Sequence, residues 1–242
     1  MTLLLLAGTL EARQIAKALA AKGVSAVASL SGGAREVDPL AVTTRLGGFG
    51  GATGFRDYLH DKGITAVLDA THPFAERITL RTERICADLD LPYCQVLRPP
   101  WVPETGDRWV TLNREEDAAD HIPEGATVFL TTGRDTLERF GNLARRHLIV
   151  RRLDPAVRPF PLPNGEFLVG TPPFSVEEEK ELFQRLGVDW LVVKNAGGEA
   201  PRSKLIAARE LGLPVAVLAR PPSSDGSRVE TVAEALDWVD RL

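Results

Sequence analysis

The residues best suited to chemistry come where short apolar runs end. Ala66–Leu68 is apolar, and Asp69, Thr71 and His72 follow it directly. In the second half of the chain, another apolar run ends at Lys194. An imidazole exchanges protons at neutral pH, so His72 is the leading candidate for a general acid. Lys194 could hold a carboxylate or stabilise developing negative charge. Asp69 could share in the chemistry or cap the backbone after it, and the sequence leaves both open.

Two glycine-containing turns are candidate anion sites. Gly8 and Thr9 join an apolar run to a helical pattern, and Thr132, Gly133 and Arg134 repeat that arrangement later. A glycine lets the backbone approach a phosphate, and a helix N-terminus favours negative charge. Neither turn carries the full GxGxxG fingerprint, so a plain strand-to-helix turn is an equal alternative. One turn could hold a cofactor pyrophosphate and the other substrate carboxylates.

The elements that must position these residues alternate in type along the chain. Short apolar runs alternate with helical patterns, which is typical of parallel strands joined by crossover helices. The helical pattern after His72 places Pro73 at a first helical position. The expected strands are Leu3–Ala7, Ala26–Leu30, Ala66–Asp69, Tyr93–Val96, Thr127–Thr131, Leu148–Arg151, Trp190–Lys194 and Val215–Ala219. The stretch Leu153–Pro173 is rich in proline and is expected to be an irregular loop with a short strand at Phe167–Val169.

The chain contains a diverged internal repeat. The spacing LPxxxxxRPP occurs at 91–100 and again at 213–222, and the strand ends at Asp69 and Lys194 precede it in the same order. We therefore expect an α/β fold with two similar Rossmann- or flavodoxin-like domains, 1–110 and 111–242, whose parallel sheets face a central cleft. The sequence leaves open whether the last helix packs on the first domain.

Composition excludes several classes of protein. The formal net charge of −4 gives no global attraction to nucleic acid or to a membrane surface. Two cysteines are too few for a disulfide framework, and we expect both to be buried thiols. No His/Cys pattern has metal-binding spacing, so no metal site is expected. No apolar run is long enough to span a bilayer or to serve as a signal sequence, and we expect a cytoplasmic protein.

Several motifs in order resemble one family. They are Asp69–Ala75 (DATHPFA), Arg98–Trp101 (RPPW), Leu130–Gly133 (LTTG), Lys194–Gly198 (KNAGG), and the Lys204–Val215 region. Together they resemble the precorrin-6A reductases of cobalamin biosynthesis, from residue 3 to residue 222. Two departures are Ala7, where the family usually has glycine, and Ala196, where it usually has serine.

The resemblance implies NADPH-dependent reduction of precorrin-6A to precorrin-6B, in which a ring double bond accepts a hydride and a proton. The nearest alternative is reduction of cobalt-precorrin-6A, whose metal would arrive inside the substrate. A more distant alternative is a two-domain binding or sensor protein. The sequence does not determine the oligomeric state.

The resemblance places the ligands between the Thr71–Phe74 edge and the Lys194–Gly198 edge. Thr71, Asn195, Gly197 and Gly198 therefore count among the expected cofactor-binding residues. The 2′-phosphate of NADPH calls for a cation near the end of a second strand. Two places qualify, and they contain Ser31, Gly32 and Arg35 in one case and Arg151 and Arg152 in the other.

Arginines are concentrated between residues 134 and 158. This local excess suggests a polyanionic ligand, and the tetrapyrrole-derived substrate carries many acetate and propionate groups. Nucleic acid is disfavoured because no aromatic interleaving or binding motif accompanies the arginines. Arg77, Arg81 and Arg84 have helical spacing and are expected to form a solvated face. The run Gly47–Gly51 is either a substrate loop or a connector.

Overall fold

The computed structural model describes residues 1–31, 39–133, 136–152, 158–222 and 226–242. They form two compact units, one made of 1–99 with 221–242 and the other of 100–220. Of the predicted site residues, Gly32, Arg35 and Arg134 lie outside the described ranges. No helix in the described ranges has the length and apolar character that crossing a membrane requires.

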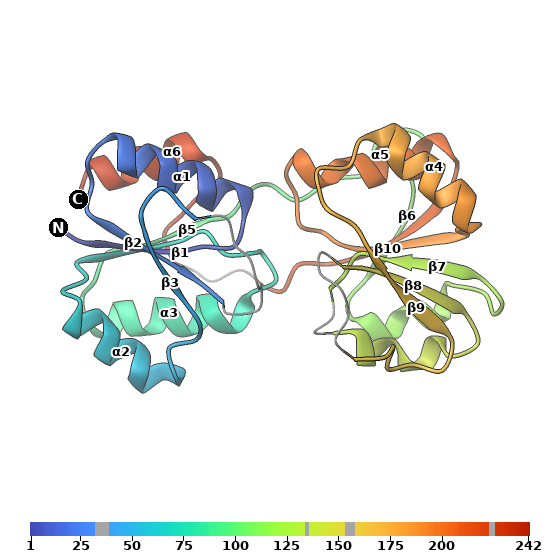
Figure 1. Cartoon of the computed structure of the whole chain (residues 1–242), viewed down its shortest axis with the longest axis horizontal. Helices are drawn as coiled ribbons and strands as arrows, with labels where there is room; N and C mark the ends of the chain where they lie inside the picture. Colours follow the sequence, from blue (N-terminus) through green and yellow to red (C-terminus); the bar gives the residue numbers. More distant parts are fainter. Residues whose placement is uncertain (32–38, 134–135, 153–157, 223–225) are drawn as a thin grey trace. The chain divides into compact units, whose positions relative to one another are not determined.

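Unit 1 is a six-stranded parallel sheet in the order β12-β5-β4-β1-β2-β3. Helices α1 and α6 cover one face, and α2 and α3 cover the other (Figure 1). Its elements are β1 (Leu3–Leu6), α1 (Leu10–Ala21), β2 (Ala26–Leu30), β3 (Thr43–Leu46), α2 (Gly51–Asp61), β4 (Ala66–Asp69), α3 (Glu76–Asp88), β5 (Tyr93–Val96), β12 (Arg228–Val229) and α6 (Val232–Asp240).

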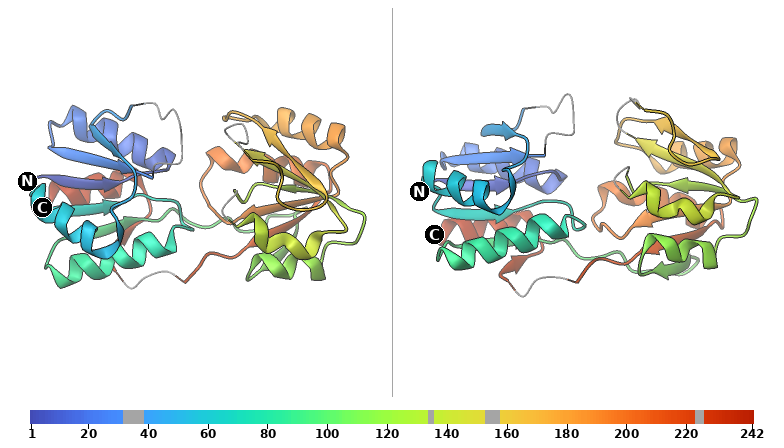
Figure 2. Two further views of the ribbon diagram at one scale, coloured as in Figure 1. Left: turned by 60° about the horizontal axis from the view of Figure 1, so that its bottom comes forward. Right: turned by 90° about the horizontal axis from the view of Figure 1, so that it is seen from below.

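Unit 2 repeats this topology with the order β6-β11-β10-β7-β8-β9. Helices α4 and α5 pack together, as do the 3₁₀ segments η1 and η2 (Figure 2). Its elements are β6 (Arg108–Leu112), η1 (Glu115–Asp120), β7 (Thr127–Leu130), η2 (Leu137–Leu143), β8 (His147–Arg152), β9 (Gly165–Val169), α4 (Val176–Leu186), β10 (Trp190–Lys194), η3 (Ala200–Arg202), α5 (Ser203–Glu210) and β11 (Pro214–Leu218).

Each sequence repeat contributes its last strand to the other unit. The chain leaves unit 1 after Pro99 and adds β6 beside β11 in unit 2. It returns after Arg220 and adds β12 beside β5, and α6 then packs on α1. The observed boundary therefore differs from the expected one at residue 110, because pairing with β11 draws β6 into unit 2.

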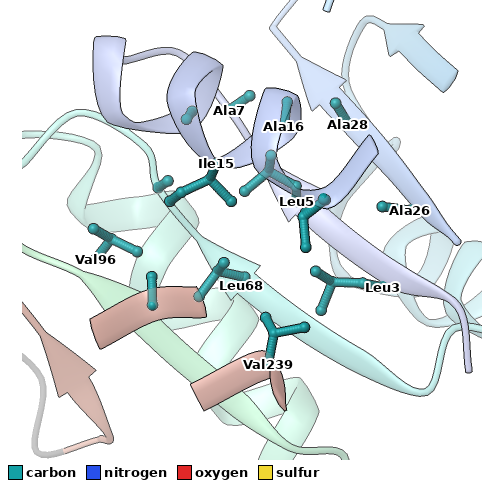
Figure 3. Packing of buried hydrophobic residues seen from close by; sticks show 14 of the residues in the cluster. Leu3, Leu5, Ala7, Ile15, Ala16, Ala26, Ala28, Leu68, Val96 and Val239 are labelled. Carbon is teal, nitrogen blue, oxygen red and sulfur yellow. The ribbon is translucent and has the colours of Figure 1, made fainter. Parts of the chain in front are cut away.

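The central strands are buried on both faces. Leu3 and Leu5 of β1 belong to the apolar cluster under α1 and α6, which includes Ile15 and Val239 (Figure 3). Leu4 and Leu6 belong to the opposite cluster with Phe55. A strand covered by helices on both sides shows a continuous apolar run instead of alternation. The four leucines therefore form a strand at the centre of the sheet.

The α/β class and the parallel sheets expected from the sequence are confirmed, and all eight expected strands are present within a residue at each end. The sequence analysis missed β3, β6 and β12 and shortened β9. All four are edge strands. Edge strands are less covered and carry polar side chains, so their apolar pattern is weak.

Candidate functional site

Asp69 ends β4 and lies fully buried beneath the loop that follows it. Its Oδ1 accepts the Thr71 N–H at 3.0 Å, and its Oδ2 accepts the hydroxyls of Thr79 at 2.8 Å and Tyr93 at 3.2 Å. Burial, together with the charge of Asp69, raises the pKa of the Tyr93 hydroxyl, so Tyr93 remains a donor. The carboxylate therefore holds the 70–79 segment in place, as one of the two sequence readings expected.

His72 lies half-buried in the turn that follows Thr71. Its Nδ1 accepts the Phe74 N–H at 3.2 Å, which requires an unprotonated Nδ1 and puts the proton of the neutral ring on Nε2. Ala75 N–H donates to His72 O at 2.7 Å and closes the turn. Helix α3 begins at Glu76, so the prediction that Pro73 occupies the first helical position was wrong. Pro73 instead stands second in this turn, where its fixed φ is favourable.

Thr9 links the first glycine turn to the same loop. Its hydroxyl donates to Ala70 O at 2.8 Å and accepts the Ala12 N–H at 3.2 Å, which caps α1 as expected. Gly8 has a φ of 148° with open space around its missing side chain. Both hydrogen-bonding functions of Thr9 are thus used within the protein, which leaves Gly8 as the open part of the turn. Ser31 follows β2 and is exposed.

In unit 2, the loop after β10 is attached to the segment that enters the unit. Asn195 Oδ1 accepts the Trp101 N–H at 2.8 Å, and its Nδ2 donates to Trp101 O at 3.0 Å. Trp101 Nε1 donates to Gly198 O at 2.8 Å. The side-chain amide of Asn195, expected to bind the cofactor, is therefore engaged with the backbone of Trp101.

The segment that leaves unit 2 holds the same loop. Arg220 donates through Nε to Asn195 O at 2.9 Å and through Nη2 to Ala196 O at 3.1 Å. Gly197 and Gly198 follow with φ values of 69° and 81°, a region that favours glycine. Lys194 is half-buried at the end of β10. The sequence analysis missed Trp101 and Arg220 as loop-holding residues, although the repeated RPP spacing marked both segments.

Thr132 and Gly133 follow β7, which ends at Leu130, and correspond in the sequence repeat to Ala7 and Gly8 of unit 1. Thr132 is only 3% exposed, and its Oγ1 has no hydrogen-bond partner among the described residues. Gly133 is exposed with a φ of 81°, and a side chain added there would meet no atom within 4 Å. A buried hydroxyl without a partner is uncommon and marks a position where a ligand can supply the missing bond.

Arg151 does not have the free guanidinium that the sequence suggested. Its Nη1 and Nη2 donate to the two carboxylate oxygens of Glu179 at 2.8 and 2.7 Å. Both side chains are buried, at 7% and 0% exposure. The Arg151 guanidinium carbon also lies 4.1 Å from the ring centroid of Phe174. An arginine paired in this way is not available to a phosphate, so the 2′-phosphate role expected of Arg151 is not supported.

The other arginines of the 134–158 segment serve separate purposes. Arg139 pairs with the buried carboxylate of Glu115, and Arg145 forms an exposed ion pair with Glu124. Arg146 is buried and donates to backbone carbonyls, including that of Ile122. Arg152 is half-buried, with its guanidinium carbon 4.8 Å from the Phe167 ring centroid. The arginines of this segment that the structure describes therefore do not form one anion site.

Lys204 adds a second buried cation near Arg151. Lys204 is the second residue of α5 and is 9% exposed, and its Nζ donates to Pro201 O at 2.5 Å. Burial and then the charge of Arg151 lower the pKa of Lys204 to about 8, and Glu179 opposes this shift. The sequence had singled out Lys204 only as part of a motif.

This fold and these strand ends define a two-unit α/β protein whose polar loops lie at the carboxyl ends of parallel strands, the usual ligand-binding position. Residues 2–240 match the family described as precorrin-6x reductase CbiJ/CobK. A solved structure named CobK precorrin-6A reductase superimposes with a TM-score of 0.95 at 37% identity, covering 100% of this chain and 96% of that one.

Curated relatives match over nearly their whole length. Precorrin-6A reductase of Rhodobacter capsulatus is 39% identical over 98% of this chain and 95% of its own. That of Mycobacterium tuberculosis is 40% identical over 99% and 97%. Cobalt-precorrin-6A reductase of Priestia megaterium is 29% identical over 97% and 96%. The chain belongs to the precorrin-6x reductase CbiJ/CobK family and is an enzyme of cobalamin biosynthesis, as the motifs predicted.

Proposed function

We propose that this enzyme reduces precorrin-6A to precorrin-6B with NADPH. The match to precorrin-6A reductases over nearly the full length carries this proposal. Relatives named precorrin-6A reductase are 35–40% identical, whereas those named cobalt-precorrin-6A reductase are 24–29% identical. This difference favours the metal-free substrate over the cobalt-containing one. Membership of an enzyme family also favours catalysis over a binding-only or sensor role.

The residues of unit 2 fit a nicotinamide dinucleotide. Thr132 Oγ1 is buried and has no hydrogen-bond partner among the described residues, and Gly133 leaves open space beside it, as a bound phosphate requires. Arg152 is the last residue of β8, the strand next to β7. A cation at the end of this second strand is in the usual position to bind a 2′-phosphate. When bound, the cofactor supplies a hydride. Lys194, at the end of the neighbouring β10, would hold a substrate carboxylate or stabilise developing negative charge.

The proton is proposed to come from His72. The donor in this step is the imidazolium form of His72, which becomes neutral when it gives up its proton, and forming it requires Nδ1 to release the Phe74 N–H that it accepts in the neutral ring. Pro73 and the hydrogen bond from Ala75 N–H to His72 O fix the turn that carries the ring. Asp69 acts one step further away, since its carboxylate holds the backbone of Thr71. In this proposal His72 contacts the substrate and Asp69 is a positioning residue.

Anaerobic turnover tests this function. Purified enzyme is incubated with precorrin-6A and either NADPH or NADH, and the product is followed by absorbance and mass. We expect the macrocycle to gain the mass of two hydrogens with NADPH, more slowly with NADH, and not at all without cofactor. A parallel reaction with cobalt-precorrin-6A should be slower. Binding of precorrin-6A without any change in its absorbance or mass would contradict the proposal.

A further inference from the structure

Arg81 on α3 has a buried Nε–H without a hydrogen-bond acceptor among the described residues. It was expected to share a solvated face with Arg77 and Arg84, yet only those two are exposed. Arg81 is half-buried, and its Nε is buried without a hydrogen-bond partner. None of the carboxylates in the described ranges forms an ion pair with it. Burying a charged donor without an acceptor is costly, so such a group is commonly completed by a ligand.

Aromatic rings hold the Arg81 guanidinium in this position. Its central carbon lies 4.8 Å from the ring centroid of Phe55 and 5.8 Å from that of Phe49. Phe55 belongs to α2 and is fully buried, and the two rings meet edge to face at 4.8 Å. These contacts favour the cation but satisfy none of its N–H donors. Burial lowers the pKa of Arg81, and the charge of Asp69 opposes that shift.

A second guanidinium lies against the same ring. Arg45 of β3 has its central carbon 3.9 Å from the Phe49 centroid. It donates to Ser29 Oγ at 2.8 Å and to the carbonyls of Gly47 and Gly48 at 2.9 Å each. Arg45 thus holds the Gly47–Gly51 loop in shape while leaving its charge without a carboxylate. Two like charges beside one ring repel each other unless an anion lies near them.

The helix that follows the loop begins without a side-chain cap. Gly50 is the N-cap residue of α2 and supplies no side-chain cap to its first N–H groups. Because α2 and α3 follow β3 and β4, both helices begin at the carboxyl edge of the sheet, where the His72 turn also lies. Arg45 and Arg81 thus both lie against the Phe49 ring, and neither forms an ion pair with a carboxylate of the described residues.

We propose that Arg81, supported by Arg45, binds a carboxylate of the macrocyclic substrate. This inference rests on the proposed function, which supplies a substrate bearing acetate and propionate side chains. A guanidinium fork matches a carboxylate with two parallel hydrogen bonds, and a flexible acidic side chain can reach a half-buried group. Arg81 is then a substrate-binding residue.

The test compares Arg81→Met with Arg84→Met. Both variants lose one positive charge from α3, but Arg84 is exposed. Steady-state kinetics with precorrin-6A should show a KM for the macrocycle raised about tenfold or more in Arg81→Met, with kcat and NADPH affinity nearly unchanged. Arg84→Met should behave like wild type. The melting temperature of Arg81→Met should equal or exceed that of wild type, because methionine removes an unpaired charge and keeps the aromatic contact.

A turnover-independent measurement separates this inference from the proposed function. Uroporphyrin, a macrocycle with acetate and propionate side chains, is titrated into each variant and its binding is followed by fluorescence. Weaker binding to Arg81→Met than to Arg84→Met supports the carboxylate site even if wild type fails to reduce precorrin-6A. Equal uroporphyrin affinity and equal KM in the two variants would overturn it. So would a lower melting temperature accompanied by a matching loss of NADPH binding, because that pattern indicates a structural role.

Discussion

Asn195 forms both of its side-chain hydrogen bonds with the backbone of Trp101, donating to its carbonyl and accepting from its N–H. Trp101 lies just after the first connection between the units, and Arg220, just before the second, donates to Asn195 O. The Lys194–Gly198 loop is therefore attached to both segments that join the units. We expect a change in either connecting segment to alter the position of Lys194.

Asn195→Ala should lower stability and activity together. It removes two hydrogen bonds and leaves backbone groups of Trp101 to find water, which costs about 1–3 kcal/mol. We expect kcat/KM to fall because Lys194 loses its fixed position. Asn195→Asp keeps the acceptor and should recover part of the stability. Chemical denaturation and steady-state kinetics measure both effects. Asn142→Ala is the control, since Asn142 makes a single exposed hydrogen bond to Glu116 O. Equal effects of the two alanine variants would contradict this role.

Arg152 should contribute to NADPH affinity, whereas Arg151 should contribute to the stability of the fold. Arg152→Ala is expected to weaken NADPH binding roughly tenfold or more, with little effect on NADH, because one charge-assisted contact to the 2′-phosphate is lost. Equilibrium titration with each cofactor measures this. If NADPH and NADH weaken equally, Arg152 does not read the 2′-phosphate.

Arg151→Met should instead destabilise the fold. It leaves the fully buried Glu179 without a partner, which typically costs about 3–5 kcal/mol. The double variant Arg151→Met/Glu179→Leu should recover much of the loss, because the buried carboxylate is removed together with its partner. Thermal and denaturant unfolding measure both variants. A double variant as unstable as the single one would show that packing, not the unpaired carboxylate, causes the loss.

His72 should be needed for turnover and not for cofactor binding. His72→Ala is expected to lower kcat by about 10²-fold, the usual contribution of a general acid, with NADPH affinity unchanged. His72→Asn can still hydrogen-bond but cannot donate a proton efficiently, so it should be as slow. Single-turnover absorbance measurements decide this. If His72→Asn retains most of the wild-type rate, His72 positions the loop, and the proton comes from another source.

The stability of the enzyme should rise with pH above neutrality. The pKa of Lys204 is lowered from 10.5 to about 8 in the folded chain. Below pH 8 both states carry the proton, and the cost of the buried charge is fully present. Between pH 8 and 10.5 Lys204 is protonated only in the unfolded chain, so the free energy of unfolding should increase by up to about 1.4 kcal/mol per pH unit. Lys204→Met should remove this slope, whereas Lys17→Met, at an exposed position, should keep it. An identical slope in both variants would exclude Lys204 as the cause.

The sequence predicted the fold most accurately for the strands that are most buried. Central strands such as Leu3–Leu6 and Ala66–Asp69 are covered on both faces, so their apolar runs stand out in the sequence. The repeat was also visible, because LPxxxxxRPP occurs twice. No local pattern indicated that β6 and β12 are exchanged between the two units. Both are short edge strands, and their partner strands lie far away in sequence.

The site followed the same division. Sequence determined which loops follow the central strands and that they carry Asp69, His72, Thr132 and Lys194. Tertiary structure decided which side chains remain available to a ligand. Arg151 is ion-paired with Glu179 of α4, and the Asn195 side chain is hydrogen-bonded to the backbone of Trp101. It also turned Arg81 away from solvent and toward Phe55. A charge or an amide is free or engaged according to what folding brings beside it, and those partners lie tens of residues away along the chain, beyond the reach of any local pattern.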